Sequence, residues 1–372
     1  MKTKKRLGLY LHIPFCKSKC SYCDFYSIES DEKRIKEYVS SLLSHIKEYS
    51  EISTNYMLDT IYIGGGTPSV IGYKNLVLIL KTVKKCFEIS KDIDITVELN
   101  PESTDKKLLK ALKKAGVNRI SFGVQTSDNR KLREISRLHT FEHAKDVINL
   151  AKTIGFTNIS VDLIYGLIGQ TLDDVQSDLL QFLSLDVPHI STYALKIEEG
   201  TPLSKQNHEP LDDDLVADMY DYICKTLGQA GFEHYEISNF SKRGYNSRHN
   251  MKYWNLDEYL GLGPSAHSLF CDTRFGFCRD LDEYMRERTI SEREETVPFD
   301  TRFGEYIMLK LRTKNGVDTD EFYRIFKRDF NDYMPKCKKF IDNGYAKYEN
   351  GIFSLTEKGF FVSNYIINEI VG

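Results

Sequence analysis

Short apolar segments alternate with longer amphipathic segments over roughly the first half of the chain. The apolar segments, rich in β-branched residues, are 7–13, 60–63, 93–99, 119–124, 159–164 and 189–195. The amphipathic segments, each long enough for a helix, are 31–49, 73–87, 105–115, 141–154 and 172–185. This alternation predicts βαβ units, and therefore a parallel sheet with helices packed outside it.

The number of units decides the expected architecture. Six strand segments alternating with helices predict an α/β fold of the partial (β/α)6 barrel type, and a flat doubly wound sheet is the alternative that periodicity leaves open. In both folds the carboxyl ends of the strands meet at one edge, where we expect the functional polar residues. A helical pattern over 211–230 and a strand pattern over 233–237 close a first domain, which we predict at residues 1–235.

The composition and the periodicity of the sequence change twice after residue 235. Residues 236–300 are aromatic, rich in Gly, Arg and Tyr, and without clear periodicity, so we expect an irregular connecting segment. Residues 301–372 contain helical patterns over 302–311, 318–330 and 333–343, followed by two short apolar runs. Between those runs stands Asn350-Gly351, a strong signal for a type I′ hairpin. Helices followed by a hairpin predict a winged-helix-like α+β module at 301–372.

Composition and charge narrow the range of functions. The chain has 41% hydrophobic and 28% charged residues, as a globular protein does, and its formal net charge is −3. Because nucleic-acid binding depends on an excess of Lys and Arg, we expect no nucleic-acid partner.

His12 and Pro14 interrupt the apolar run that follows the basic start of the chain, and no stretch reaches the length of a membrane helix. We therefore expect a cytoplasmic protein without a signal peptide.

Three of the eight cysteines are crowded into one short loop. Cys16, Cys20 and Cys23 follow the first predicted strand with the spacing C-x3-C-x2-C. Thiolates bind iron–sulfur clusters and zinc, and three thiolates on four irons leave one iron open to a small molecule. The alternative is zinc with His12 as a fourth ligand, but zinc ligands usually come in two separated pairs and no second pair stands nearby. The loop is therefore predicted to hold a [4Fe–4S] cluster.

The run Leu-Tyr-Leu-His-Ile-Pro-Phe-Cys, residues 9–16, and the three-cysteine loop resemble the radical S-adenosylmethionine (radical SAM) family. The resemblance covers the whole chain and is strongest to the branch of oxygen-independent coproporphyrinogen III oxidases and their relatives. Oxidases of this branch carry a further cysteine two places after the third. That place is Phe25 here, which is typical of the heme chaperones in the same branch.

This resemblance implies the bound groups and the partners of the protein. The bound groups are a [4Fe–4S] cluster, SAM and heme. The partners are a reductant for the cluster and heme-accepting apo-proteins, which we expect in the respiratory chain. The alternative function is that of a true oxidase, in which a radical derived from SAM abstracts hydrogen from a porphyrinogen propionate. A plain zinc-binding interaction protein is the third class.

A glycine-rich loop ends the second predicted strand, with the sequence Gly-Gly-Gly-Thr-Pro at 64–68. Glycines let backbone N–H groups approach a ligand, although a plain turn explains the loop as well. The resemblance implies contacts between this loop and the methionyl end of SAM. In full, it implies a SAM pocket formed by Tyr10, Tyr22, Gly65, Gly66, Thr67, Glu98, Gln125, Arg137 and Asp162. Glu98, Gln125 and Asp162 also lie at or just past predicted strand ends, where we expect functional residues.

A second candidate site lies in the aromatic segment, in Arg-His-Asn-Met-Lys-Tyr-Trp at 248–254. The resemblance links the pattern His-Asn-x-x-Tyr-Trp to heme. An imidazole is an axial ligand for iron, so His249 is the predicted heme ligand, with Tyr253 and Trp254 as an apolar bed. The alternative is that these residues only fix the segment onto the barrel. We expect the segment to cover the open mouth near the cluster. Weaker ligand candidates are His139, His143, His189 and His267.

Overall fold

The computed structural model describes residues 4–29, 31–206, 208–293, 298 and 301–372. Its larger part is built on a sheet of twelve strands, in the order β12-β11-β10-β9-β1-β2-β3-β4-β5-β6-β8-β7. The central strands are β1 (Lys5–Ile13), β2 (Tyr56–Gly65), β3 (Ile89–Leu99), β4 (Arg119–Gln125), β5 (Asn158–Tyr165) and β6 (His189–Ala194). Each of these pairs in parallel with the next one along the chain.

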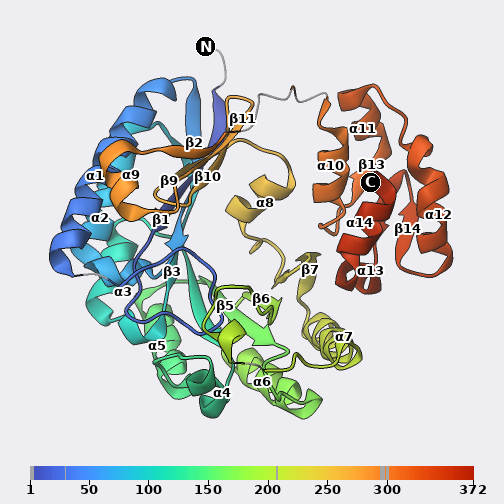
Figure 1. Cartoon of the computed structure of the whole chain (residues 1–372), viewed down its shortest axis with the longest axis horizontal. Coiled ribbons are helices and arrows are strands. Elements are labelled where there is room, and N and C mark those ends of the chain that lie inside the picture. Colours follow the sequence, from blue (N-terminus) through green and yellow to red (C-terminus); the bar gives the residue numbers. More distant parts are fainter. Residues whose placement is uncertain (1–3, 30, 207, 294–297, 299–300) are drawn as a thin grey trace.

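The central strands keep the order of the chain, without the reversal that a doubly wound sheet requires. Their connecting helices are α1 (Glu32–Ile52), α2 (Gly72–Cys86), α3 (Lys106–Lys114), α4 (Asn129–Glu134), α5 (Phe141–Ile154) and α6 (Leu172–Ser184), with short 3-10 helices η1 (Pro68–Ile71) and η2 (Pro101–Ser103). Right-handed crossovers place these helices on one face, and Figure 1 shows them along the outer side of a curved sheet. The predicted partial barrel is confirmed, and the flat doubly wound alternative is wrong.

Local sequence fixes where these helices begin and end. Asp31, Asp105 and Thr171 stand just before α1, α3 and α6, and the side chain of each accepts a hydrogen bond from a backbone N–H of the first turn. Gly155 ends α5 in the left-handed conformation that favours glycine. After β6 come η3 (Leu203–Lys205), α7 (Asp213–Gln229) and β7 (Glu233–Glu236).

The segment after β7 is more ordered than its sequence pattern predicts. It contains β8 (Asn239–Ser241), α8 (Arg248–Trp254), β9 (Tyr259–Leu262), β10 (His267–Phe270), β11 (Thr273–Phe277), α9 (Leu281–Glu287) and β12 (Ile290–Arg293). Strand β9 pairs in parallel with β1 and extends the sheet beyond it. Gly261 obscures the strand pattern there, yet β9 requires this glycine because a Cβ would overlap the carbonyl group of His267 on β10. The prediction of an irregular segment is wrong.

The C-terminal module contains α10 (Phe303–Lys310), β13 (Val317–Asp318), α11 (Thr319–Phe326), η5 (Phe330–Tyr333), α12 (Met334–Asp342), β14 (Ala346–Glu349), β15 (Ile352–Leu355), α13 (Glu357–Phe361) and α14 (Ser363–Val371). Its strands form a small sheet in the order β13-β15-β14. Asn350 and Gly351 have φ angles of 51° and 77°, as a type I′ turn requires at both central positions. The predicted winged-helix-like module is thus confirmed. The predicted domain limit at 300/301 falls next to residues outside the described ranges.

The module contacts the barrel through backbone and side chains. The N–H of Ile237 donates to the carbonyl of Arg312 at 3.0 Å, and that of Lys314 donates to Tyr235 at 3.0 Å. In Figure 1, α10 lies opposite α8, so these two helices face each other between the barrel and the module. None of the helices in the described ranges has the length and apolar character needed to cross a membrane.

Candidate functional site

The three-cysteine loop lies at the carboxyl end of β1. Phe15 is fully buried and forms a β-bridge with Ile28, which closes the base of the loop. The thiols of Cys16, Cys20 and Cys23 are half-buried, and all three residues line a single cavity of about 560 Å³. Burial raises the pKa of the Cys23 thiol to about 11, so binding a metal there would release a proton.

The surroundings of these thiols fit a cluster better than a single zinc ion. In the described parts of the chain, no three His, Cys, Asp or Glu side chains converge closely enough to hold one ion. His12, the fourth ligand of the zinc alternative, is buried and uses both ring nitrogens, at 3.0 Å from the Tyr10 hydroxyl and 2.9 Å from the carbonyl of Tyr26. Three thiols spread over one cavity wall suit a larger object with several metal atoms.

A network of hydrogen bonds contacts the sulfur atoms of Cys16 and Cys20. The Arg137 guanidinium donates to Cys20 Sγ at 3.5 Å and to Asn100 Oδ1 at 2.8 Å. Asn100 in turn donates to Thr67 Oγ1 at 2.9 Å, and that hydroxyl lies 3.5 Å from Cys16 Sγ. Donors of this kind orient ligand sulfurs and stabilise their negative charge. Arg137 was expected to contact SAM, and its position next to Cys20 lets it act on the thiols as well.

Two carboxyl groups, those of Glu98 and Asp162, also line the cavity. Glu98 accepts hydrogen bonds from the Tyr62 hydroxyl at 2.6 Å and from the Gly65 N–H at 3.2 Å. Burial, together with the charge of Asp162, raises the pKa of Glu98 to about 7. Burial also raises the pKa of Asp162 to about 6. These poorly hydrated carboxyl groups suit the binding of an ammonium group or of hydroxyl groups.

The glycine loop holds the cysteine loop in place. The N–H of Gly66 donates to Ile13 at 2.8 Å, and the N–H of Thr67 donates to Phe15 at 2.7 Å. A Cβ on Gly66 would lie 2.7 Å from the Phe15 carbonyl oxygen, so the two loops can approach this closely only because residue 66 is glycine. These two N–H groups therefore serve the fold, and the loop presents its remaining surface to the cavity.

Eight of the nine predicted SAM-pocket residues line this one cavity. Tyr10 is absent from the described cavity wall; its ring lies inside the barrel, 6.2 Å from that of Tyr62. Gln125 lines the cavity with a φ of 75°, a strained conformation for a residue other than glycine and one that marks functional positions. Sequence reasoning missed further lining residues, which include Asn100, Ser121, Gly123, Tyr193, Ala194, Lys196 and Glu198. Most of these stand at strand ends, so the strand-end rule itself was the available signal.

The second candidate, His249, lies on α8 in the interior of the protein. Its side chain is 1% exposed, with Nδ1 at 2.8 Å from Thr60 Oγ1 and Nε2 at 2.9 Å from the Tyr253 hydroxyl. Burial, with a smaller effect of the Lys252 charge, lowers the pKa of His249 to about 3, so the ring is neutral. None of residues 248–254 lines the cysteine cavity, so the expectation that this run covers the mouth near the cluster is wrong. A later residue of the same segment, Arg279, does contact the cysteine loop through Asp24.

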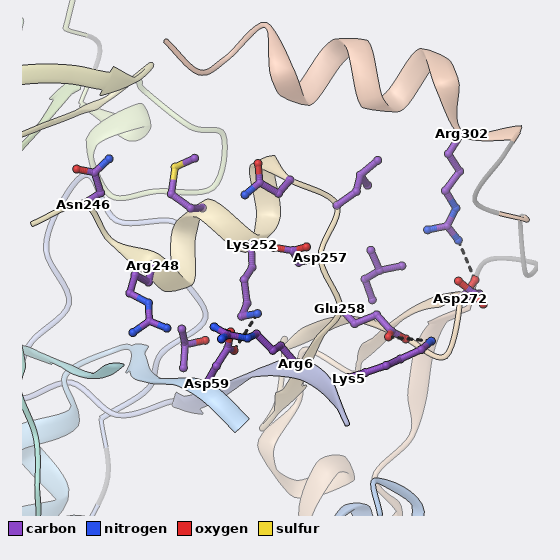
Figure 2. A pocket seen from close by; sticks show the side chains of 15 residues that line it. Lys5, Arg6, Asp59, Asn246, Arg248, Lys252, Asp257, Glu258, Asp272 and Arg302 are labelled. Carbon is purple, nitrogen blue, oxygen red and sulfur yellow. Dashed lines mark hydrogen bonds and ion pairs between the residues drawn. The ribbon is translucent and has the colours of Figure 1, made fainter. Parts of the chain in front are cut away.

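A second cavity, of about 620 Å³, lies beside α8 at the amino ends of β1 and β2. Figure 2 shows Lys252 and Asp59 pointing toward each other within it, and they form a buried ion pair at 2.8 Å. Arg248, the residue before His249, donates to the Asp92 carbonyl at 2.5 Å and lies 3.4 Å from the Asp92 carboxylate. Most charges around α8 are thus already paired within the protein.

Comparison with known proteins identifies the family of this chain. The profile of the Radical SAM superfamily matches residues 10–182, and that of the HemN C-terminal domain matches residues 300–362. A heme chaperone HemW from Lactococcus lactis is 35% identical, over 99% of this chain and 98% of the relative. One from Bacillus subtilis is 32% identical over 98% of each chain. This chain belongs to the HemW family.

A solved structure extends the comparison to the fold. The coproporphyrinogen III oxidase HemN from Escherichia coli, described as a radical SAM enzyme, superimposes with a TM-score of 0.87. It covers 99% of this HemW-family chain at 20% identity, so the likeness concerns the fold alone. Phe25 is the residue whose identity is typical of the heme chaperones and not of the oxidases of this branch. In this HemW-family chain its ring lines the cysteine cavity and is 69% exposed.

Proposed function

We propose that this protein is a heme chaperone that binds heme and delivers it to apo-proteins. The observation that carries the proposal is the similarity over nearly the whole chain to proteins named heme chaperone HemW, at 35% and 32% identity. Phe25 in the cavity wall supports it, because the oxidases of this branch are expected to carry a cysteine there. The acceptors we propose are respiratory apo-proteins, with a separate reductant serving the cluster in the cytoplasm.

The proposal assigns Cys16, Cys20 and Cys23 to a [4Fe–4S] cluster. It assigns the SAM pocket to Tyr22, Gly65, Gly66, Thr67, Glu98, Gln125, Arg137 and Asp162, with Tyr10 behind the cavity wall. When bound, such a cluster offers an open iron to SAM. The chain itself orients the thiols through Arg137 and Thr67 and presents poorly hydrated carboxyl groups from β3 and β5.

The proposal also keeps His249 as a residue on which heme binding depends. Because both of its ring nitrogens are hydrogen-bonded, direct ligation of iron would require the Tyr253 hydroxyl or Thr60 to release the ring. His249 acts on heme either through such a rearrangement or through Tyr253, whose ring lines a third cavity.

One experiment separates the chaperone from the alternative oxidase. The full-length protein, with its cluster reconstituted anaerobically, is titrated with heme and is incubated in parallel with SAM, a reductant and coproporphyrinogen III. We expect a saturable change in heme absorption and no decarboxylation. Protoporphyrinogen above the level of a cluster-free control would favour the oxidase, and the absence of any saturable heme binding would overturn the chaperone.

A further inference from the structure

The strained backbone at Gln125 needs a neighbouring group to hold it. Gln125 ends β4 with a φ of 75°, and the N–H of Thr126 donates to the carbonyl of Val124 at 3.1 Å. These two features describe a γ-turn with positive φ, which is rare and strained. The pairing of β4 with β5 also shifts its register between Gly123 and Gln125. Strain of this kind persists only where the surrounding structure enforces it.

The turn places the side chain of Gln125 in the wall of the cysteine cavity. Its amide lies over Gly123, because a Cβ on that glycine would be 2.9 Å from Gln125 Nε2. The same Cβ would be 3.0 Å from the Arg137 guanidinium, which donates to Cys20 Sγ at 3.5 Å. The amide of Gln125 thus stands beside this guanidinium, and its direction depends on the turn.

A carboxylate on α6 holds the two residues that follow the turn. Asp178 accepts hydrogen bonds from the Thr126 hydroxyl, at 3.0 Å from each carboxylate oxygen. It also accepts from the N–H and the hydroxyl of Ser127, at 2.6 and 2.5 Å. The Thr126 hydroxyl itself accepts from the Asp128 N–H at 3.1 Å, so its proton is free to point to Asp178. An ionised carboxylate, which only accepts hydrogen bonds, matches this set of donors.

The place of Asp178 on its helix is unusual for a carboxyl group. Asp178 is 2% exposed and lies on the face of α6 that also buries Val175, Leu179 and Phe182. Burial raises the pKa of Asp178, and the hydrogen bonds from Ser127 act against that shift. An apolar side chain would be easier to bury at this position than a carboxylate. The carboxylate therefore indicates a role other than packing.

A second turn fixes the carboxylate itself. Gln170, in the loop after β5, donates to Asp178 through Nε2 at 3.3 Å and accepts from the Leu167 N–H at 3.0 Å. Gln170 is buried, and Leu167 is fully buried. The carboxylate is thus held between the loops that follow β4 and β5, so it cannot move along with the first turn if that turn relaxes.

We propose that Asp178 is a positioning residue for SAM, because it holds the turn at Gln125 and thereby keeps the Gln125 amide in the pocket wall. Asp178 is absent from the described cavity wall, so its effect on a ligand passes through Gln125. This inference rests on the SAM pocket assigned in the proposed function.

The test measures SAM affinity by anaerobic equilibrium dialysis of the full-length, cluster-reconstituted protein. Asp178→Asn replaces one acceptor oxygen by an amide group that faces donors. It should raise the Kd for SAM at least about tenfold, which corresponds to about 1.4 kcal/mol, with the iron content of the wild type. Asp173→Asn is the matched control and should keep the wild-type affinity, because it removes the same charge from an exposed position of the same helix.

Glycine at position 125 separates positioning from a general loss of structure. Gln125→Gly removes the amide and adopts positive φ without strain, so its turn no longer depends on Asp178. Gln125→Gly alone should weaken SAM binding, and adding Asp178→Asn should raise the Kd by less than about twofold further. An equal effect of Asp178→Asn in both backgrounds would overturn the proposal.

The outcomes separate this inference from the function on which it rests. If the wild type binds no SAM at full iron content, the assigned pocket is wrong and the inference fails with it. If the wild type binds SAM and Asp178→Asn binds it equally well, only the inference is wrong. Should Asp178→Asn lose its fold or its iron, Thr126→Val removes a single donor at nearly constant shape and should raise the Kd about threefold. An unchanged Kd in Thr126→Val would contradict the proposal.

Discussion

The cysteine cavity and the α8 region both contain polar and titratable side chains, yet the two regions use them differently. In the cavity, three thiols and two carboxyl groups line an open volume of about 560 Å³. Around α8, the imidazole of His249 and the ammonium group of Lys252 are buried and paired with other side chains. Side-chain chemistry therefore indicates a ligand less strongly where the polar groups beside a cavity are already paired with one another, as Lys252 and Asp59 are.

The largest effect should come from the thiols, because they have no substitute in the cavity. Replacing Cys16, Cys20 and Cys23 by Ala should reduce the metal content from about four irons and four sulfides per chain to none. Cys86→Ala, at the end of α2, is the matched control for loss of a half-buried cysteine and should keep the cluster. Iron and sulfide analysis after anaerobic purification checks this, and one zinc per wild-type chain would refute it.

In the α8 region the expected effect is on stability and leaves the cluster intact. Lys252→Met removes the nearer cation of the buried Asp59, at 2.8 Å, and leaves only Arg6 at 3.8 Å. Breaking a buried pair costs up to about 3–5 kcal/mol. Lys5→Met removes a lysine that is 67% exposed and should cost less than about 0.5 kcal/mol. Denaturant unfolding measures both. If Lys252→Met were as stable as the control, the contrast between the two regions would not hold.

The two regions also differ in how far the sequence predicts them. Eight of the nine predicted SAM-pocket residues line the cavity because strand ends meet at one edge of a parallel sheet, and strands can be read from apolar runs. Burial of His249 could not be predicted in this way. It depends on Thr60, which is 189 residues away in the sequence, and polar residues on a short helix carry no periodic signal of burial.

Strand β9 was missed for a related reason. Two glycines, Gly261 and Gly263, stand within or next to it, and glycine lowers the apparent strand preference. The strand forms because β1 provides a parallel edge, with Gly8 paired to Tyr259 and Leu11 to Leu262. Only the tertiary structure contains that information.

A smaller effect is expected where the glycine loop meets the cysteine loop. Gly66→Ala places a methyl group 2.7 Å from the carbonyl oxygen of Phe15, and such overpacking typically costs about 1–3 kcal/mol. The displaced loop should retain less iron as well as bind SAM more weakly. Gly228→Ala, on α7 with nothing near the added methyl, is the control. If Gly66→Ala lost SAM binding with full iron content, the glycine loop would contact SAM without supporting the thiols.

The last effect concerns the carboxyl group of Glu98 and appears only as the pH changes. Burial raises its pKa from 4.5 to about 7. The folded protein therefore binds this proton more tightly than the unfolded chain does. The contribution of Glu98 to stability consequently falls as the pH rises from 4.5 to 7, by at most about 3.4 kcal/mol at about 1.36 kcal/mol per pH unit. Glu98→Gln cannot ionise, and it also relieves Asp162 of a neighbouring charge.

The variant should therefore gain stability relative to the wild type as the pH rises from 5 to 8, with most of the gain complete near pH 7. Thermal unfolding midpoints at several pH values measure the difference, and Glu37→Gln, on an exposed part of α1, controls for the loss of one negative charge. A difference between Glu98→Gln and the wild type that stays constant with pH would mean that Glu98 is well solvated. The carboxyl groups of the cavity would then resemble those of an ordinary surface, and the contrast with the paired His249 and Lys252 of the α8 region would rest on the thiols alone.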